Sequence, residues 1–408
     1  MGDDVKTSKA KGETALTPAP SPAHRERGAT VPSPIIHHLS PMAEVVIIGS
    51  GIFGAAIGYH LAEAGLNVVI VERGAFCGEA SGANVGLVTV SAKPIGVLFD
   101  LAWMGQRRYE TLSERLGRDI HFRQPGTMNL TSTPEDLAER RQLTEAQRER
   151  GLDVRHISGD EARELEPWIP DSILGGSFCP TDGGVYPFAV VKAYLAKAQE
   201  LGVKLFVGAE VTGVSVENGR ATGVETTRGP IRAKWVVNAA GAWAERISAM
   251  VGLRTPMTPV RGQLLVTLPL PPLMNRVVFG VEPSVRQMYS GNSIVGSVTQ
   301  RAGFDKRLTP QTIRALARGI VELHPALASA PVIRGWAGLR PGTPDEMPIL
   351  GVSRRVPGFV IATGGFRNGI LYGPAAGQLI ADDILGRPLE IDIDPLRPER
   401  FEEIDVRD

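Results

Sequence analysis

The first part of the chain with a regular pattern of apolar residues begins near residue 43. Glu44–Ile48 is apolar and rich in β-branched residues after its first position, which is typical of a buried parallel strand. Ile52–Ala64 has apolar residues at helical spacing and is followed by Gly65, which favours a helix end. Val68–Val71 is again a short apolar run. These three segments predict a βαβ unit.

Strand patterns are more frequent in the middle of the chain. The sequence predicts an amphipathic helix followed by four strands, at Pro187–Leu201, Val203–Val207, Glu210–Val216, Ala221–Thr227 and Trp235–Asn238. We interpret the run from residue 203 to residue 227 as a β-meander. Residues 257–298 are again β-rich, and a helix with Pro310 at its first position runs to Leu323. The charged segment Glu135–Gly151 predicts a solvated surface helix.

The end of the chain returns to the pattern of its beginning. Gly358–Thr363 predicts a last buried strand, and Gly369–Leu385 predicts the helix after it. We therefore predict an α/β fold, α+β overall. In it, a Rossmann-like nucleotide-binding domain is assembled from separated segments, and an antiparallel β-sheet domain is inserted into it. The first domain comprises residues 43–115, 172–255 and 332–400. The inserted domain, which we expect to bind the substrate, comprises residues 116–171 and 256–331.

Residues 1–42 differ in composition from everything after them. They mix Pro, Ser, Thr, Lys and Arg with little apolar periodicity, so they cannot bury enough apolar surface to order themselves. They also lack the apolar core of a secretory signal. We expect a disordered N-terminal extension; a transit peptide and a translation start at Met42 are the alternatives.

Composition argues against several classes of function. The 408 residues contain 44 Lys and Arg and 44 Asp and Glu, so the formal net charge is zero. This balance argues against nucleic acid or an anionic membrane surface as the main partner. Cys77 and Cys179 are the only cysteines, so we expect no disulfide framework, no metal site and a reducing cytoplasm. No apolar run approaches the roughly 18–20 residues of a transmembrane span, although a dehydrogenase could still associate peripherally with the inner membrane.

The turn after the first strand carries the first chemical motif, Gly49-Ser50-Gly51-Ile52-Phe53-Gly54. A strand precedes it, a helix follows, and an acid, Glu72, comes about 20 residues later, as in a dinucleotide site. Gly49 allows the tight turn, Gly51 lets the backbone approach a pyrophosphate, and Gly54 lets the helix pack on the strand. The helix N-terminus favours the anion, and the acid can accept hydrogen bonds from ribose hydroxyls. A glycine-rich turn without a ligand is the alternative.

Two features favour FAD over NAD. The segment from Gly78 to Gly86 is small and polar, and it offers several backbone N–H groups along an extended cofactor. No second glycine motif with strand–helix context occurs, whereas an enzyme that reduces its flavin with NADPH usually needs two such sites. We therefore predict that the electrons come from an organic substrate.

Two arginines, Arg340 and Arg367, lie among small and apolar residues in the C-terminal part of the chain. A guanidinium in such surroundings can bind a carboxylate through two parallel hydrogen bonds. Gly364–Gly369 leads into a helix whose N-terminus can stabilise negative charge on a reduced flavin. The alternative is that each arginine pairs with a protein carboxylate such as Asp345 or Glu346.

These motifs together resemble those of the D-amino acid oxidase-type flavoproteins, and the resemblance covers residues 43–400. Within that superfamily the chain is most similar to glycine oxidase and to the flavoprotein subunit of hydrogen cyanide synthase. The resemblance rests on four stretches, Trp336–Gly351, Phe366–Ile370, Val237–Trp243 and Val260–Gln263. It implies hydride transfer from the substrate's α-carbon to flavin N5, without a strong protein base if the amine arrives neutral.

The resemblance also assigns residues by position. In glycine oxidase the arginine matching Arg340 binds the substrate carboxylate, and the one matching Arg367 lies in the same pocket. The residues matching Gly364–Ile370 line the flavin. At the position of Val211, backbone groups of the relatives cover the adenine. We predict no catalytic side chain, and a substrate site made of Arg340, Arg367, Arg286 and Ser284. The predicted cofactor-binding residues are Gly49, Gly51, Ile52, Phe53, Gly54, Glu72, Arg73, Ser81, Gly82, Ala83, Asn84, Gly86, Val211, Ala240, Gly241, Trp243, Arg340, Gly364, Gly365, Phe366, Arg367, Asn368, Gly369 and Ile370.

One position departs from the family pattern. Close relatives place a carboxylate-binding tyrosine where this chain has Ser284. By strand alternation Ser284, Arg286 and Met288 share one side, and Tyr289 faces the other. Arg286-Gln287 resembles the flavoprotein subunits of opine oxidases and D-hydroxyproline dehydrogenases. Glycine itself is therefore in question, and a larger or N-substituted amino acid is compatible with the sequence. A solvated Arg286 on an edge strand is the alternative.

The predicted activity is FAD-dependent oxidation of a small amino acid or secondary amine, such as glycine, sarcosine, a D-amino acid or a proline-like compound. We expect non-covalent FAD, because residues 331–375, where monomeric sarcosine oxidases have their attachment cysteine, contain no Cys or His. Oxidation of a hydroxy acid or polyol phosphate is the second choice within the superfamily. A different class is a flavoprotein subunit of a hetero-oligomeric amine or opine dehydrogenase, or of a cyanide synthase-like complex, that passes electrons to partner chains. The electron acceptor can be oxygen, a quinone or a partner subunit. The chain can form a homo-oligomer or a hetero-oligomer.

Overall fold

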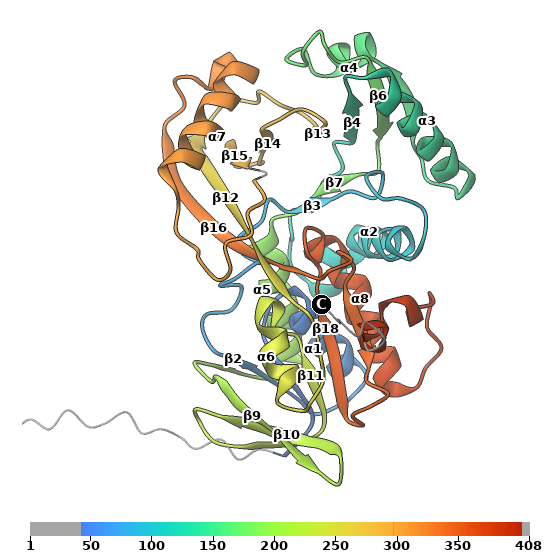
Figure 1. Ribbon diagram of the computed structural model, residues 1–408, viewed down its shortest axis with the longest axis vertical. Helices are drawn as coiled ribbons and strands as arrows, with labels where there is room; N and C mark the ends of the chain where they lie inside the picture. Colours follow the sequence, from blue (N-terminus) through green and yellow to red (C-terminus); the bar gives the residue numbers. More distant parts are fainter. Residues whose placement is uncertain (1–41, 297, 402–408) are drawn as a thin grey trace, which may run out of the picture. The chain divides into compact units, whose positions relative to one another are not determined.

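The computed structural model describes residues 42–296 and 298–401 (Figure 1). The predicted N-terminal extension lies outside the described residues up to residue 41. The largest sheet has the strand order β17-β18-β11-β1-β2-β8, and β10 and β9 extend it from β11. Its strands are β1 (Met42–Ile48), β2 (Val68–Glu72), β8 (Lys204–Val207), β9 (Val211–Glu217), β10 (Arg220–Thr226), β11 (Ile231–Asn238), β17 (Ile349–Val352) and β18 (Phe359–Thr363). Pairing is parallel from β18 to β8, whereas β17 is antiparallel to β18.

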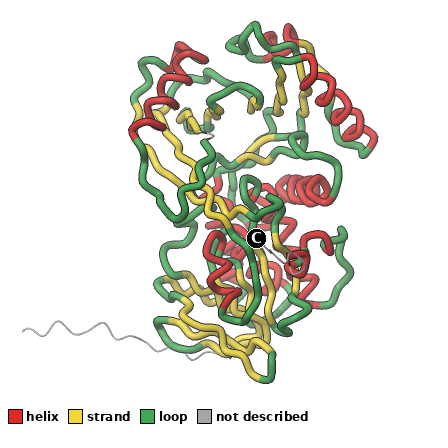
Figure 2. The backbone as a smooth tube through the Cα atoms, viewed as in Figure 1, coloured by secondary structure: helices red, strands yellow, loops and turns green. Residues whose placement is uncertain are grey.

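Different elements cover the two faces of this sheet, because side chains alternate along each strand. Val45 and Ile47 of β1 pack into the core formed with four helices. Val46 and Ile48 pack into the core on the other face, with the β9–β10 hairpin and α6 (Ala244–Ala249). Figure 2 shows helices beside the strands in this part of the molecule. The four helices of the first face are α1 (Ile52–Glu63), α2 (Val97–Leu116), α5 (Pro187–Glu200) and α8 (Gly369–Leu385).

A second, fully antiparallel sheet has the order β14-β15-β12-β16. Its strands are β12 (Thr258–Pro269), β14 (Ser284–Gln287), β15 (Asn292–Gly296) and β16 (Val332–Gly342). Helix α7 (Pro310–Leu323) packs Leu316 and Ile320 against this sheet. The long strands β12 and β16 run from α7 towards the start of α8 (Figure 1), where the amide of Phe366 donates to the carbonyl of Pro341 at 3.2 Å.

A third sheet has the order β13-β4-β6-β5. Its strands are β4 (Thr127–Thr131), β5 (Arg155–Ser158), β6 (Gly175–Cys179) and β13 (Val277–Phe279). Two helices belong to this region, α3 (Pro134–Glu149) and α4 (Gly159–Leu165), and α4 begins with a capping box of Ser158 and Glu161. The short strands β3 (Leu87–Val88) and β7 (Gly183–Gly184) pair with each other. The 3₁₀ helices are η1 (Gly241–Trp243), η2 (Pro325–Leu327), η3 (Asp394–Leu396) and η4 (Pro398–Phe401).

Most elements predicted from the apolar pattern are confirmed, among them β1, α1 and β2 as a βαβ unit and the later helices α3, α5, α7 and α8. The predicted β-meander is wrong in its first strand. Lys204–Val207 (β8) pairs in parallel with β2, because α5 crosses over the sheet and returns the chain in the same direction. Only β9, β10 and β11 form a meander. The 20-residue helix α2 was not predicted.

The division into two domains stays a prediction. Strand β6 lies in the predicted cofactor segment 172–255 but pairs with β4 and β5. Strand β16 begins the predicted segment 332–400 and pairs along its length with β12 of the second sheet. None of the helices within residues 42–296 and 298–401 is long and apolar enough to cross a membrane.

Candidate functional site

The glycine turn after β1 is packed so closely that side chains do not fit. Gly49 has φ +103°, and a Cβ atom there would lie 2.6 Å from the carbonyl oxygen of Ala239. A Cβ atom on Gly54 would lie 2.0 Å from the carbonyl oxygen of Gly49. The turn therefore brings the N-terminus of α1 directly against the strand ends, the arrangement in which exposed backbone N–H groups attract a phosphate.

Two side chains hold the backbone around this turn. The amide and hydroxyl of Ser50 donate to Glu72 at 3.0 and 2.9 Å, and the amide of Gly74 donates to the other oxygen of Glu72 at 2.9 Å. The hydroxyl of Ser81 accepts from the amide of Ile52 at 3.0 Å. Glu72 at the end of β2 and Ser81 in the following loop are thus positioned beside the start of α1.

A second wall comes from the end of β11 and from η1. Asn238 donates to the carbonyl of Ala244 at 2.8 Å and to Ser248 at 3.0 Å, which orders the chain after the strand. Thr363 at the end of β18 donates to the carbonyl of Gly241 at 3.0 Å. Parallel strand ends that meet at one edge of a sheet are the usual place for a ligand in α/β folds.

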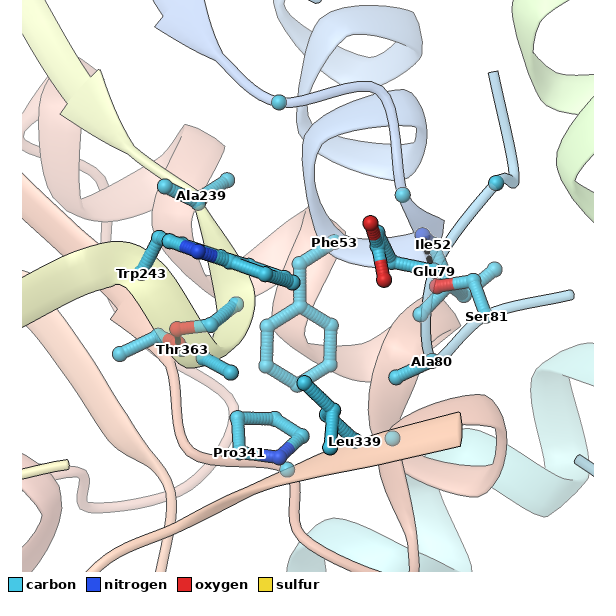
Figure 3. A pocket seen from close by; sticks show the side chains of 18 of the residues that line it. Ile52, Phe53, Glu79, Ala80, Ser81, Ala239, Trp243, Leu339, Pro341 and Thr363 are labelled. Atoms are coloured by element: carbon cyan, nitrogen blue, oxygen red, sulfur yellow. Dashed lines mark hydrogen bonds between the residues drawn. The ribbon is translucent and has the colours of Figure 1, made fainter. Parts of the chain in front are cut away.

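These walls enclose a pocket that also reaches β16 and the start of α8. Figure 3 shows Trp243 and Glu79 on opposite sides of Phe53, with Leu339 and Pro341 below it. The predicted cofactor residues that line the pocket are Gly49, Gly51, Ile52, Phe53, Glu72, Arg73, Ser81, Asn84, Gly86, Val211, Ala240, Gly241, Trp243, Gly364, Gly365, Phe366, Arg367, Gly369 and Ile370. Those outside its lining are Gly54, Gly82, Ala83, Asn368 and Arg340.

Sequence reasoning missed several lining residues. Glu79 and Cys77 lie in or next to the small, polar segment that was singled out, so their positions in that loop were a usable signal. Leu339 and Pro341 flank Arg340 on β16. No local pattern could have revealed them, because β16 reaches the pocket only through its pairing with β12.

The loop between Ser81 and Gly86 connects the pocket to β16. The side-chain amide of Asn84 donates to the carbonyls of Ala80 and Ser81 at 3.0 and 2.8 Å and thereby closes a turn. The indole of Trp336 donates to the carbonyl of Ala83 at 3.3 Å. Since Trp336, Gly338 and Arg340 alternate on one face of β16, the side chain of Arg340 leaves the strand on the face that meets this loop.

Within residues 42–296 and 298–401, no carboxylate pairs with Arg340 or Arg367. Arg340 is partly buried and donates to the carbonyl of Val298 at 2.9 Å. Burial, followed by the charge of Arg367, lowers the pKa of Arg340 to about 10. Arg367 is exposed and donates to the hydroxyl of Thr299 at 3.0 Å.

The alternative that these arginines pair with Asp345 or Glu346 is wrong. Asp345 instead forms an ion pair with Arg400 at 2.8 Å. In the part of the chain that the structure describes, no Asp or Glu forms a salt bridge with Arg340 or Arg367. Two guanidinium groups therefore lie beside the pocket with donors available to an anion.

Arg286 on β14 has a different environment from the one expected. It is 9% exposed, so the alternative of a solvated arginine on an edge strand is wrong. Its guanidinium donates to the backbone carbonyls of Val85, Gly86 (2.9 Å) and Val185 (3.2 Å). A Cβ atom on Gly184 would lie 2.3 Å from this guanidinium, and burial lowers the pKa of Arg286 to about 10.

Strand β14 ends at Gln287, and the regular alternation of its side chains ends there too. Ser284 is the first residue of β14 and its amide donates to Glu282 at 3.2 Å. Gln287 accepts from the amides of Leu273 and Met274 at 2.7 and 3.2 Å. Tyr289 lies in the turn after β14, so strand alternation does not determine which side it faces. Whether Ser284 and Arg286 contact a substrate remains a prediction.

The glycine turn, the acid at the end of β2 and the parallel strand ends define a dinucleotide-binding protein of the α/β class, with an antiparallel sheet whose strand β16 brings Leu339 and Pro341 to the same pocket. The sequence profile of a family described as FAD dependent oxidoreductase matches residues 44–383. The chain belongs to this family, and FAD is its cofactor.

The relatives are named as a glycine oxidase and as a subunit of hydrogen cyanide synthase. Hydrogen cyanide synthase subunit HcnC of Pseudomonas aeruginosa is 33% identical over 402 residues, covering 88% of this chain and 96% of that protein. Glycine oxidase of Bacillus subtilis is 31% identical over 371 residues, covering 89% and 99%. The crystal structure of glycine oxidase from Geobacillus kaustophilus has a TM-score of 0.84 at 29% identity and covers 88% of this chain and 99% of that one.

These similarities confirm the predicted family, fold class and enzyme class. The chain is an FAD-dependent oxidoreductase that acts on amines or amino acids. Its pocket fits this cofactor: the glycines without room for a Cβ atom suit the pyrophosphate, and Glu72 suits a ribose. The start of α8, which also lines the pocket, offers backbone N–H groups to a flavin.

Proposed function

We propose that the chain oxidises the C–N bond of a small amino acid or secondary amine and that Arg340 binds the carboxylate of this substrate. The observation that carries the proposal is a partly buried guanidinium beside the FAD pocket with no carboxylate partner among the described residues. Such a group is best satisfied by a carboxylate that arrives with the substrate, because the planar fork of donors matches the two carboxylate oxygens.

The protein's role in this proposal is to bind and to orient. FAD supplies the acceptor for the hydride that leaves the substrate's α-carbon, and the resulting imine hydrolyses in solution. Arg340 fixes the carboxylate, and Arg367 adds a second positive charge on the same side. No side chain is assigned as a base, so the amine has to bind in its neutral form.

The cofactor-binding residues predicted from the sequence belong to the same proposal. The lining residues of the glycine turn are proposed to contact the pyrophosphate of FAD, and those at the start of α8 are proposed to contact the flavin. We propose that FAD is bound without a covalent link. Burial raises the pKa of Cys77, the cysteine that lines the pocket, to about 12, so this thiol is held in its unreactive form.

The test of the proposed function is anaerobic reduction of the purified holoenzyme. Glycine, sarcosine, both proline enantiomers, D-alanine and an opine are mixed with the protein, and loss of the oxidised flavin's visible absorption is followed. We expect at least one amino acid of this panel to reduce the flavin rapidly. An intact FAD spectrum with every compound, at concentrations up to tens of millimolar, would refute the proposal.

A second candidate function is that of a flavoprotein subunit that passes electrons to partner chains. It is favoured by the 33% identity, over 88% of this chain, to a protein named as a subunit of hydrogen cyanide synthase. The same preparation distinguishes the candidates. Turnover with oxygen indicates an oxidase, turnover only with an artificial dye indicates a dehydrogenase, and turnover only after partner chains are added supports the subunit.

A further inference from the structure

The connection between β15 and α7 is anchored on a buried arginine of β12. Gln300 exchanges two backbone hydrogen bonds with Arg261, at 2.8 and 3.0 Å, and also accepts from the Arg261 side chain at 2.9 Å. Arg261 is 7% exposed, and it donates to Asp305 at 3.1 Å and to the carbonyl of Arg307 at 3.2 Å. Both ends of the segment 300–307 are therefore held on the second sheet.

Between these anchors the segment reaches the FAD pocket. The rings of Phe304 and Trp243 have their centroids 5.1 Å apart. The ammonium group of Lys306 donates to both oxygens of Glu79 at 3.1 Å. Trp243 follows β11 and Glu79 follows β2, and both line the pocket. One short segment thus contacts both walls.

A pocket residue joins the two walls at the same place. The guanidinium carbon of Arg73 lies 3.7 Å from the centre of the Trp243 ring, and a nitrogen of Arg73 lies 3.0 Å from Glu79. Arg73 is exposed, and Glu79 and Trp243 are partly exposed. They mark the side on which the pocket meets solvent, since its inner side is the buried sheet and the start of α1.

Phe304 and Lys306 form the tip of the segment, and their contacts with the pocket are weaker than those at the anchors. The Lys306 and Glu79 side chains are 44% and 35% exposed, and Phe304 is 49% exposed, so water and salt compete with both contacts. The anchor on Arg261, by contrast, is buried and combines an ion pair with several hydrogen bonds. The tip can therefore detach from the pocket while the anchors stay in place.

We propose that residues 300–307 form a strap that retains FAD, with Lys306 and Phe304 as its two contacts on the pocket rim. The strap crosses the opening between Glu79 and Trp243, and FAD can leave only after the tip has detached. The inference goes beyond the proposed function: it concerns the retention of the cofactor and does not depend on the identity of the substrate.

The experiment is a double-mutant cycle in which the rate of FAD release is measured. The holoenzyme is diluted and the rise of free-flavin fluorescence is followed for the wild type, Lys306→Gln, Glu79→Gln and the double variant. Arg301→Gln is the matched control, because it removes a positive charge from the same exposed segment without a contact on the pocket rim. The cycle is needed because Glu79 also pairs with Arg73.

We expect Lys306→Gln to accelerate FAD release roughly two- to fivefold in the wild-type background, which is the range for an exposed ion pair. In the Glu79→Gln background the same change should have no effect, and Arg301→Gln should leave the rate unchanged. Equal rates for Lys306→Gln and Arg301→Gln would overturn the proposal. So would an acceleration by Lys306→Gln that persists when Glu79 is already replaced.

Discussion

Replacing Arg340 by alanine tests the central element of the proposed function. In the described structure this guanidinium is partly buried, its pKa is lowered to about 10 by burial and by Arg367, and it donates to the carbonyl of Val298 at 2.9 Å. Arg340→Ala removes the charge that we assign to the substrate carboxylate. Without substrate, however, it removes only one hydrogen bond from the folded protein.

The expected magnitude follows from this difference. Truncating one partner of a buried charge pair costs about 2–5 kcal/mol, and partial exposure places Arg340 near the lower end of this range. A loss of about 2–3 kcal/mol corresponds to a decrease of roughly 30- to 150-fold in kcat/KM, mostly through KM. The lost hydrogen bond to Val298 is worth about 1 kcal/mol, so FAD should stay bound and the Tm should fall by only a few degrees.

The assay compares kcat/KM for the best amino acid of the panel with the FAD content from visible absorption and with the Tm. Arg334→Ala is the matched control, because Arg334 lies on the same strand but is exposed, 5.9 Å from the Trp336 ring centre. It should change kcat/KM less than about twofold. An unchanged kcat/KM for Arg340→Ala refutes the reasoning. Loss of FAD from that variant would show that Arg340 is structural.

Three further predictions concern the pocket and its support. Gly54→Ala places a Cβ atom 2.0 Å from a carbonyl oxygen, so it should lower the free energy of unfolding by about 1–3 kcal/mol and reduce the FAD content. Gly213→Ala, whose new contacts start at 3.5 Å, is the control. Equal Tm values for the two variants would contradict the packing argument. Arg286→Met removes a buried donor to three carbonyls and should cost about 1–3 kcal/mol in thermal unfolding, whereas a raised KM with an unchanged Tm would show that Arg286 binds substrate instead. Burial raises the pKa of Cys77 and of Cys179 to about 12, so both thiols stay protonated below that pH. Alkylation of the two thiols in the native protein should therefore not increase between pH 7 and 10. Labelling of either cysteine at pH 9, detected by mass spectrometry, would disprove this.

Helix α2 illustrates why a helix can escape prediction. Gly105 lies inside it, and a glycine there costs about 1 kcal/mol relative to alanine, so this position weakens the helical signal of the local sequence. The reason for the glycine is tertiary: a Cβ atom at Gly105 would lie 2.1 Å from the carbonyl oxygen of Leu371 in α8. The close contact between the two helices explains the residue, and no pattern within residues 97–116 indicates it.

The arginines show the same limit for the functional site. The sequence proposes Arg286, Arg340 and Arg367 as residues of the substrate site, and the family resemblance assigns the carboxylate to Arg340. Their environments differ in the structure. Arg286 is buried against backbone carbonyls, Arg340 is partly buried without a carboxylate partner among the described residues, and Arg367 is exposed.

The sequence by itself determined the βαβ unit, its glycine turn and its acid, and hence the choice of a dinucleotide. These features are local: the φ angles of Gly49 and the period of the apolar residues depend on neighbours along the chain. Only the tertiary structure decided that Lys306 meets Glu79, 227 residues away, and that β16 carries Leu339 and Pro341 to the pocket. The physical reason is that such contacts depend on how sheets and helices pack against each other, and packing sums many weak interactions that no short stretch of sequence contains.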